Sequence, residues 1–298
     1  MKLILSEKYG KIYQKENYML FTKEILKKAI DELAAENKIF SNERQFQLEL
    51  AMKLQHKGFD VELEVVSSDK SFDEFQKLSK EDREKLYTDI IIKQENDKYI
   101  AIELKYKTPQ KFYSYKTIKG TTITFPQGAS DLGAFLFWKD VERLENFKNI
   151  KLNFDNDKKV EKGFAVLLTN QEDYWVGKED SLCRNFFPVG IKKGSLNWYV
   201  KIDKITKERV NGRTAKSKCD IIEVTEDKTS LYKSYFDKDG KAKMKDVSPI
   251  KLKGNYNCVN GQDYIGWFDY DIEYDAVEID KDKLIPPEFR YLMLEVEP

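Results

Sequence analysis

The stretch "YTDIIIKQENDKYIAIELKYKT", residues 87–108, decides the fold because it reads as two strands joined by a short turn. Asp89 stands where the first strand begins and is followed by three isoleucines. In the second strand, side chains alternate between two faces, so Glu103 and Lys105 share one face and their apolar neighbours point the other way. The stretch therefore predicts a hairpin that fixes a carboxylate and an ammonium group side by side.

The length of the turn decides whether Asp89 joins that face. A three-residue loop at 96–98 would place Asp89 opposite Lys105 and diagonal to Glu103, on the same face. A loop of two or four residues would send Asp89 to the other face. A site shared by the three side chains therefore predicts a loop with an odd number of residues, or a bulge.

Upstream of the hairpin, the pattern predicts two helices and a strand. Apolar spacing indicates a helix within 18–38 and a second helix that Ser41 or Asn42 can cap and that Gly58 ends. Residues 59–66 then alternate between apolar and polar, as a strand does. These elements would bring a helix face and a strand up to the hairpin.

Downstream, the pattern predicts a short strand at 121–125, an amphipathic helix at 127–147 and a strand buried on both faces at 163–170. Further strands are expected at 197–202, 219–224 and 289–296. This order favours an α/β fold with a mixed central sheet flanked by helices and a β-rich C-terminal elaboration. We expect residues 1–298 to form one elaborated domain, with its core at about 41–170 and an insertion at 200–260.

Composition limits the chemistry that the chain can perform. The 298 residues are 41% hydrophobic and 35% charged, as in a globular protein, and they include only three cysteines and one histidine. The cysteines lack any C-x-x-C spacing, which argues against a zinc site or a disulfide framework. His56 alone, on a predicted helix, makes a Ser-His-Asp apparatus improbable. Catalysis, if present, should use carboxylates and lysines.

The sequence contains no apolar run of 18 residues, and the apolar stretch near its start is shorter than we expect for a signal peptide. We therefore expect a cytoplasmic protein without a membrane partner.

The formal net charge is zero, but the charge is distributed unevenly along the chain. Residues 104–130 contain five lysines, several aromatic residues and no acidic residue. Residues 192–218 carry nine basic residues and two acidic ones, whereas eleven acidic residues follow from Asp263 onward. Basic stretches with aromatic residues suit a polyanion held by its phosphates, and solvated lysine-rich loops are the alternative.

Two carboxylates at a strand pair suit Mg²⁺ or Mn²⁺, which take one or two protein carboxylates together with phosphate oxygens of a substrate. Such an ion polarises a scissile phosphate, and a nearby ammonium group stabilises the developing charge. Asp89, Glu103 and Lys105 therefore predict phosphodiester hydrolysis that needs no histidine.

With these residues, the chain resembles the PD-(D/E)XK nucleases of the restriction-endonuclease-like superfamily. Asp89 is followed after thirteen residues by Glu-Leu-Lys at 103–105, and Thr88 stands where the family has Pro. The helix before the hairpin, and the helix and buried strand after it, also match the order of elements in that superfamily. The resemblance covers residues 41–170.

The resemblance implies roles for individual residues. Asp89 and Glu103 would bind the metal, and Lys105 would orient the attacking water or stabilise charge. The superfamily often supplies a further Glu from its first core helix, and Glu43, on the core-facing side, matches better than Glu49. Glu43 would then be an accessory carboxylate and metal ligand, with a solvated helix residue as the alternative reading.

Gln127 resembles the Gln of a Gln-x-x-x-Tyr element in the exonuclease-like branch, although Asp131 stands at the Tyr position. It would contact the substrate or water at the metal. Arg143 would contact a phosphate or pair with Asp140 in its own helix. The remaining residues expected to contact nucleic acid are Lys107, Lys111, Tyr113, Tyr115, Lys116 and Lys119, and the aromatic ones among them are equally compatible with packing.

The sequence thus predicts a metal-dependent nuclease with DNA as the expected partner. A restriction or phage-defence setting, with a homodimer or a defence-system partner protein, is what the resemblance suggests. The alternatives are a non-catalytic nucleic-acid-binding subunit of the same fold and a small-molecule hydrolase. Loss of Asp89 and Glu103 would abolish cleavage by the nuclease, whereas a binding subunit would tolerate it.

Overall fold

The structure is a computed structural model. It describes residues 20–68, 72–79, 83, 86–94, 97–108, 113–117, 122–125, 130–147, 151–152, 159–176, 194–206, 216–223, 225, 235–236, 242–244, 249–256, 266–272, 274–275 and 288–298.

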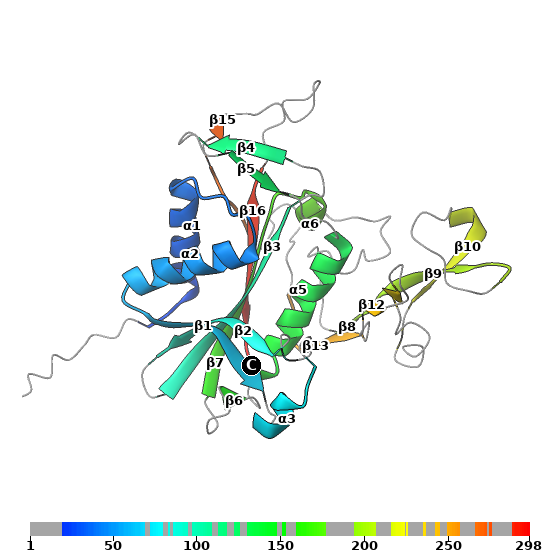
Figure 1. Ribbon diagram of the computed structural model, residues 1–298, viewed down its shortest axis with the longest axis horizontal. Helices are drawn as coiled ribbons and strands as arrows, with labels where there is room; N and C mark the ends of the chain where they lie inside the picture. The colour runs from blue at the N-terminus through cyan, green and yellow to red at the C-terminus, as the bar shows by residue number, and fades with distance from the viewer. Residues whose placement is uncertain are drawn as a thin grey trace, which may run out of the picture.

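A mixed sheet of six strands forms the centre of the α/β fold (Figure 1). Its order is β14-β16-β7-β3-β2-β1, and β3 and β7 are its parallel pair. The two-residue strand β6 (Lys151–Leu152) pairs with the far end of β1. The bounds are β1 (Asp60–Ser68), β2 (Tyr87–Lys93), β3 (Lys98–Lys107), β7 (Lys159–Thr169), β14 (Trp267–Asp269) and β16 (Arg290–Val296).

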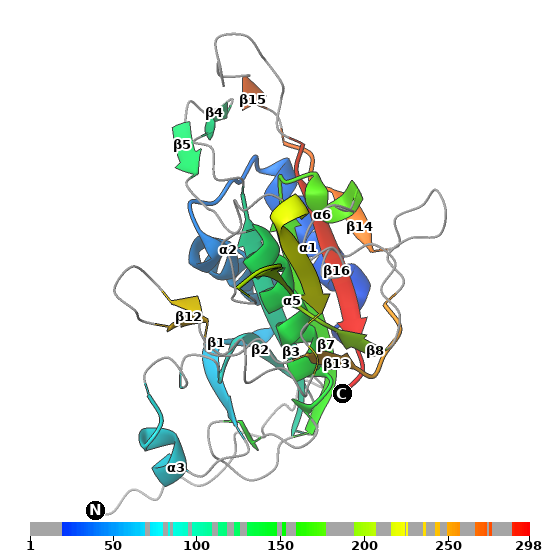
Figure 2. The ribbon, with the colours of Figure 1, turned by 90° about the vertical axis from the view of Figure 1, so that its right-hand side faces the viewer.

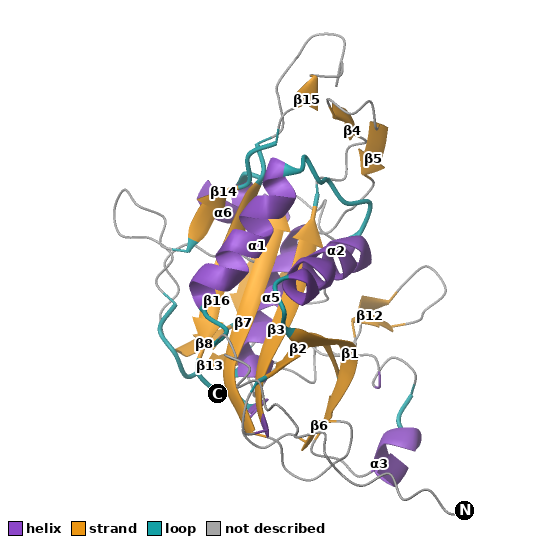
Figure 3. Cartoon of the chain, turned by 90° about the vertical axis from the view of Figure 1, so that its left-hand side faces the viewer, coloured by secondary structure: helices purple, strands orange, loops and turns teal. Residues whose placement is uncertain are grey.

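Helices cover both faces of this sheet. Figures 2 and 3 show α5 (Ser130–Leu144) on one face, and α1 (Lys23–Ala35) and α2 (Glu43–His56) on the other. Successive side chains of the strands point to opposite faces of the sheet and so pack against both helix layers. Ile90 and Ile102 pack with α1 and α2, whereas Ile91 and Ala101 pack with α5. The predicted mixed sheet flanked by helices is confirmed.

The start and end of α2 follow from local chemistry. The Asn42 side chain accepts a hydrogen bond from the Gln45 N–H at 2.9 Å, and the Gln45 side chain accepts one from the Ser41 N–H at 2.8 Å. Gly58, just after the helix, has a φ of +92°, which suits a residue without a side chain. The predicted helix cap at Ser41 or Asn42 is confirmed, with Asn42 as the N-cap.

Smaller elements surround the central sheet. The short helices are α3 (Phe72–Gln76), α6 (Asp173–Val176) and the 3-10 turn η4 (Lys216–Lys218). The remaining strands are β4 (Tyr113–Thr117), β5 (Thr122–Phe125), β8 (Gly194–Leu196), β9 (Tyr199–Asp203), β10 (Cys219–Glu223), β11 (Tyr235–Phe236), β12 (Ala242–Met244), β13 (Ile250–Leu252) and β15 (Tyr274–Asp275). They form the sheets β15-β4-β5, β10-β9, β11-β12 and β13-β8.

The central sheet extends beyond the range 41–170 that the sequence predicts as the core. β14 and β16 close one side of it, and β16 pairs along β7 from Arg290–Thr169 to Val296–Gly163. α1 adds a packed helix upstream of that range. The described parts of 200–260 lie in the small sheets and not in the central one. Among the helices that the structure describes, none is long and apolar enough to cross a membrane.

A buried carboxylate fastens the segment around β13 to the end of α5. Glu145 accepts hydrogen bonds from the N–H groups of Lys253 at 2.8 Å and Gly254 at 2.7 Å, and from the Tyr256 hydroxyl at 2.7 Å. Together with burial, this contact raises the pKa of Tyr256, because the hydroxyl donates to the carboxylate. One side chain thus holds two chain segments that are about a hundred residues apart.

We expect Glu145→Ala to lower the free energy of unfolding by about 3 kcal/mol, because the mutation leaves buried donors without an acceptor. Urea unfolding followed by circular dichroism would measure this. Glu172→Ala, which removes an exposed carboxylate, should change it by less than about 0.5 kcal/mol. Equal effects of the two substitutions would show that the Glu145 contacts contribute nothing specific.

Candidate active site

The site forms where β2 parts from β3. The two strands pair from Lys93–Tyr99 to Ile90–Ile102, and the Gln94 N–H donates to the Lys98 carbonyl at 2.8 Å. This register gives an odd loop, as the sequence predicts for a shared site. The loop is shifted by one residue from 96–98, so Asp89 lies across from Glu103 and diagonal to Lys105, the reverse of the expected arrangement.

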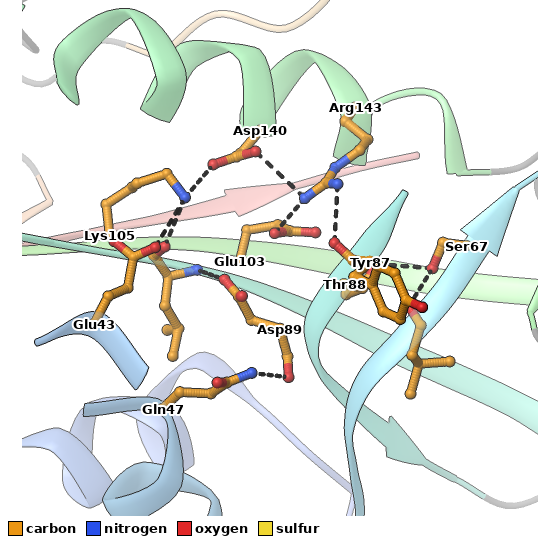
Figure 4. Close-up of polar contacts among 12 residues, drawn as sticks. Glu43, Gln47, Ser67, Tyr87, Thr88, Asp89, Glu103, Lys105, Asp140 and Arg143 are labelled. Carbon is orange, nitrogen blue, oxygen red and sulfur yellow. Dashed lines mark hydrogen bonds and ion pairs between the residues drawn. The ribbon is translucent and has the colours of Figure 1, made fainter. Parts of the chain in front are cut away.

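Beyond Ile90, the regular backbone pairing of β2 with β3 ends, and the carboxylate of Asp89 forms the next hydrogen bond to β3. Its Oδ2 accepts a hydrogen bond from the Leu104 N–H at 2.6 Å, while the Asp89 carbonyl accepts one from Gln47 Nε2 at 2.6 Å (Figure 4). β2 continues beside β1, with Thr88 opposite Val65. The Asp89 side chain is therefore fixed at the point of divergence.

β1 is distorted at the same level. Its pairs Leu63–Ile90 and Val65–Thr88 place Glu64 across from Asp89, and Glu64 has a φ of +52°. Val65 packs on the α5 side although a regular strand would turn it to the α1–α2 side with Val61. A non-glycine residue in this region costs on the order of 1 kcal/mol. The strain at Glu64 thus accompanies the turn that moves β2 away from β3.

Helix α2 reaches the site through its first two turns. Glu43 Oε2 accepts a hydrogen bond from the Tyr106 N–H at 2.9 Å, and Glu43 Oε1 lies 3.4 Å from Lys105 Nζ. Gln47, one turn later on the same face, is buried and holds the Asp89 carbonyl. Glu49 instead pairs with Lys38 at 3.3 Å, away from the site. The spacing that favours Glu43 over Glu49 matches these positions.

Helix α5 approaches from the other face and supplies two charged residues (Figure 4). Asp140 Oδ2 lies 2.9 Å from Lys105 Nζ, and Asp140 Oδ1 lies 3.3 Å from Arg143 Nη2. Arg143 Nη2 is also 2.5 Å from Glu103 Oε2, and Arg143 Nη1 donates to the Tyr87 carbonyl at 3.0 Å. The predicted intrahelical pair of Asp140 and Arg143 is present, but both residues also bind the strands.

Burial and neighbouring charges shift the proton affinities of the site. Burial raises the pKa of Asp89 to about 7, against the opposing effect of Lys105. Burial also raises the pKa of Glu103, although Arg143 opposes this. Burial disfavours the charged form of Lys105, but Asp140, Glu43 and Asp89 outweigh it and raise the pKa of the ammonium group. Lys105 is therefore a fixed cation and not a base at neutral pH.

The carboxylates of Asp89 and Glu103 suit a divalent cation. Glu103 is only 2% exposed, and its buried Oε1 has no hydrogen-bond partner among the residues that the structure describes. An acceptor in this position is costly unless a cation or water satisfies it. Asp89 is near enough for its charge to raise the pKa of Glu103. Two carboxylates are enough to hold Mg²⁺, which keeps several waters.

Among the described side chains, no third ligand joins Asp89 and Glu103. Within the part of the chain that the structure describes, no group of three or more His, Cys, Asp or Glu side chains is placed to hold a metal ion. Glu43 is engaged by Lys105 and by the Tyr106 N–H. Its role as a metal ligand stays a prediction.

The structure thus brings Asp89, Glu103, Lys105, Glu43 and Arg143 together. Lys107 follows on the same strand, and burial lowers its pKa. A methyl group added at Gly133 would lie 3.0 Å from Lys107 Cδ, so the Lys107 stem runs along α5. Gln127, Lys111 and Lys119 lie outside the described residues, as do the side chains of Tyr113, Tyr115 and Lys116, whose backbone belongs to β4.

Gln47 and Asp140 complete the site, and sequence reasoning did not select them as site residues. Gln47 lies four residues after Glu43, a spacing that puts both side chains on one helix face. For Asp140, the sequence predicts only a pair with Arg143 within the helix. Since helix spacing does not show which strand a helix packs against, its contact with Lys105 had no signal in the sequence.

Comparisons of this chain with protein-family models, with curated proteins and with solved structures found no match.

We expect the raised pKa of Asp89 to make the metal-free protein less stable as the pH rises from about 4 to about 7. The folded state binds the proton more tightly than the unfolded chain, so stability present at low pH is lost as the pH passes through the folded pKa of about 7. Asp89→Asn should therefore stabilise the protein by about 2–3 kcal/mol more at pH 8 than at pH 5.

Urea unfolding in EDTA at both pH values would measure this difference. Asp60→Asn, which neutralises an exposed carboxylate at the start of β1, serves as the control and should show no such pH dependence. A stabilisation by Asp89→Asn of the same size at pH 5 and pH 8 would contradict the prediction.

Proposed function

We propose that this protein is a metal-dependent nuclease that hydrolyses phosphodiester bonds, with DNA as its substrate. The observation that carries the proposal is the arrangement of Asp89, Glu103 and Lys105. Two carboxylates lie where β2 and β3 part, and one of them has a buried oxygen with no hydrogen-bond partner in the described part of the chain. A fixed ammonium group lies two residues further along the strand.

The order of elements supports the resemblance to the PD-(D/E)XK nucleases and a restriction-endonuclease-like core. Helix α2, the antiparallel strands β1, β2 and β3, helix α5 and strand β7 follow one another, with β7 parallel to β3. Glu43 at the start of α2 contacts Lys105, as expected for a Glu contributed by the first core helix. Fold alone does not establish an activity, so the proposal depends on the site.

Hydrolysis joins a water oxygen to phosphorus and breaks one ester bond, and negative charge builds up on the phosphoryl oxygens and the leaving oxygen. Bound to Asp89 and Glu103, Mg²⁺ or Mn²⁺ would supply Lewis-acid polarisation and a more acidic water. Lys105 supplies a positive charge that Asp140 and Glu43 hold in place. Gln47 donates to the Asp89 carbonyl and the Leu104 N–H donates to the Asp89 carboxylate, so the backbone and the side chain of Asp89 are both held in place.

Basic residues next to the site would hold the nucleic acid. Lys107 lies on the same face of β3 as Glu103 and Lys105. Tyr113, Tyr115 and Lys116 belong to strand β4. No acidic residue occurs from 104 to 130, so this part of the chain suits contacts with phosphates. A cytoplasmic defence role, with a homodimer or partner protein, is part of the proposal only through the family resemblance.

The direct test incubates the protein with plasmid and linear DNA at low salt and Mg²⁺ or Mn²⁺, with an EDTA control. Asp89→Ala is the loss-of-site variant, and Asp60→Ala, an exposed carboxylate on β1, is the matched control. Metal-dependent cleavage by the parent and by Asp60→Ala, lost in Asp89→Ala, would support the proposal. RNA substrates in parallel would separate the two nucleic acids.

One observation favours the second candidate function, a non-catalytic nucleic-acid-binding subunit of the same fold. Arg143 already pairs with Glu103, and Asp140 already pairs with Lys105, so internal ion pairs stabilise the cluster. A protein that only binds would use these pairs as structural elements. DNA binding by the parent without cleavage in any metal, and unchanged binding by Asp89→Ala, would support this alternative.

A further inference from the structure

Arg143 joins three groups at the centre of the site. Its Nη2 lies 2.5 Å from Glu103 Oε2 and 3.3 Å from Asp140 Oδ1, and its Nη1 donates to the Tyr87 carbonyl at 3.0 Å. Burial opposes the charge of the guanidinium group, but Glu103, Asp140 and Asp89 outweigh it and raise the pKa of Arg143. Arg143 is therefore a permanent cation beside the carboxylates that would bind a metal.

Arg143 and a divalent cation would use the same carboxylate. Glu103 is almost completely buried, so its negative charge needs a nearby positive charge in every state of the protein. Arg143 supplies that charge at Oε2, while no described residue forms a hydrogen bond with Oε1. A divalent cation at Oε1 would add two positive charges next to the guanidinium group, and repulsion between the cations would then weaken the hold of Arg143 on Glu103.

Asp140 gives the guanidinium group a second carboxylate within reach. It lies one turn before Arg143 on α5 and is already 3.3 Å from Nη2. A small shift of Arg143 from Glu103 toward Asp140 would keep the arginine paired. The helix therefore carries both the competing cation and its alternative partner.

From these contacts we propose that Arg143 is the internal counter-ion of Glu103 in the metal-free protein, and that a divalent cation binding to Asp89 and Glu103 displaces the guanidinium group toward Asp140. The inference rests on the proposed function, because it assumes that these carboxylates bind a metal. Its consequence is that Arg143 lowers the affinity of the site for the metal and stabilises the site when no metal is bound.

Isothermal titration calorimetry with Mg²⁺, in the absence of nucleic acid, tests this directly. We expect Arg143→Gln to bind Mg²⁺ at least about tenfold more tightly than the parent, because the competing cation is gone. Lys139→Gln is the matched control: Lys139 lies one turn earlier on α5 and pairs with Glu142 at 3.1 Å. It should leave the Kd within about twofold.

The results separate the two proposals. If the parent binds Mg²⁺ and Arg143→Gln binds it equally or more weakly, the counter-ion role is wrong and the metal site stands. If neither the parent nor Arg143→Gln binds Mg²⁺, the metal site and the proposed nuclease fall together with the counter-ion role. Tighter binding by Arg143→Gln but not by Lys139→Gln supports both.

Arg143→Lys provides a second variant if Arg143→Gln does not fold, as judged by circular dichroism. A lysine keeps the charge, but its single nitrogen cannot reproduce the two-pronged contact with Glu103 and the Tyr87 carbonyl. It should therefore compete less well, and the Kd for Mg²⁺ should fall about threefold. An unchanged or weaker affinity in this variant would overturn the counter-ion role.

Discussion

Lys105→Met should lower the rate of metal-dependent DNA cleavage by at least about 10³-fold while leaving the Kd for DNA within about threefold. The ammonium group is the cation that α2 and α5 fix on the same face as Glu103, through Glu43 at 3.4 Å and Asp140 at 2.9 Å. A preorganised charge of this kind stabilises the transition state more than the bound substrate. Methionine has a side chain of similar length to lysine but lacks the positive charge of the ammonium group. Single-turnover cleavage and filter binding on the same DNA would measure the two quantities.

Lys107→Met is the matched control because Lys107 lies two residues further along the same face of β3. If Lys107 only contacts phosphates, its loss should raise the Kd and reduce the salt dependence of binding by about one charge, with little change in the rate of the chemical step. Equal losses of rate in the two variants would remove the distinction between a catalytic and a binding lysine. Circular dichroism must first show that Lys105→Met folds, since the substitution leaves Asp140 with Arg143 as its remaining ion-pair partner.

The sheet could be predicted from the sequence wherever side-chain periodicity carries the information. The alternation in the second strand of the hairpin and the continuous apolar run at 163–170 indicate strands, and both belong to central strands of the sheet, β3 and β7. What periodicity does not contain is pairing between distant segments. The position of β16 beside β7 is set by tertiary packing, so the predicted core at 41–170 omitted the strand that completes it.

The site could be predicted in part for the same reason. Asp89, Glu103 and Lys105 lie within one hairpin, so strand geometry and loop parity relate them, and only the register was off by one loop residue. Asp140 and Arg143 come from a helix that crosses the other face of the sheet. Their spacing predicts the pair within the helix correctly but says nothing about Lys105 or Glu103. Those ion pairs depend on the position of α5 on the sheet.

The contacts of α5 change the charge balance of the hairpin, because they add ion pairs to Lys105 and Glu103. In the sequence, Asp89 and Glu103 are predicted as an acidic pair beside Lys105 that would bind an external cation. In the structure, Arg143 balances Glu103, and Lys105 is held between Asp140 and Glu43. The cluster can therefore fold without metal. A metal ion that binds Glu103 would therefore have to rearrange its pair with Arg143.

A double-mutant cycle between Glu103 and Arg143 should give a coupling energy of about 3 kcal/mol in the metal-free protein at pH 8. Arg143→Gln leaves the buried Glu103 carboxylate without its ion-pair partner, and Glu103→Gln leaves the buried guanidinium group with Asp140, at 3.3 Å, as its remaining carboxylate. Each single substitution should lower the free energy of unfolding by about 3–5 kcal/mol. The double variant removes both charges, so it should be little worse than either single one. Urea unfolding in EDTA would measure the four proteins.

The pair of Lys98 and Glu161, which joins β3 and β7 at a much more exposed position, provides the reference cycle with Lys98→Gln and Glu161→Gln. Its coupling should be below about 1 kcal/mol, because solvent screens the two charges. The contrast matters, since a counter-ion that sets the metal affinity of Glu103 must first be strongly coupled to it. Additive effects of the Glu103 and Arg143 substitutions would mean that the 2.5 Å contact stores no interaction energy, and a metal ion would then have no competitor to displace.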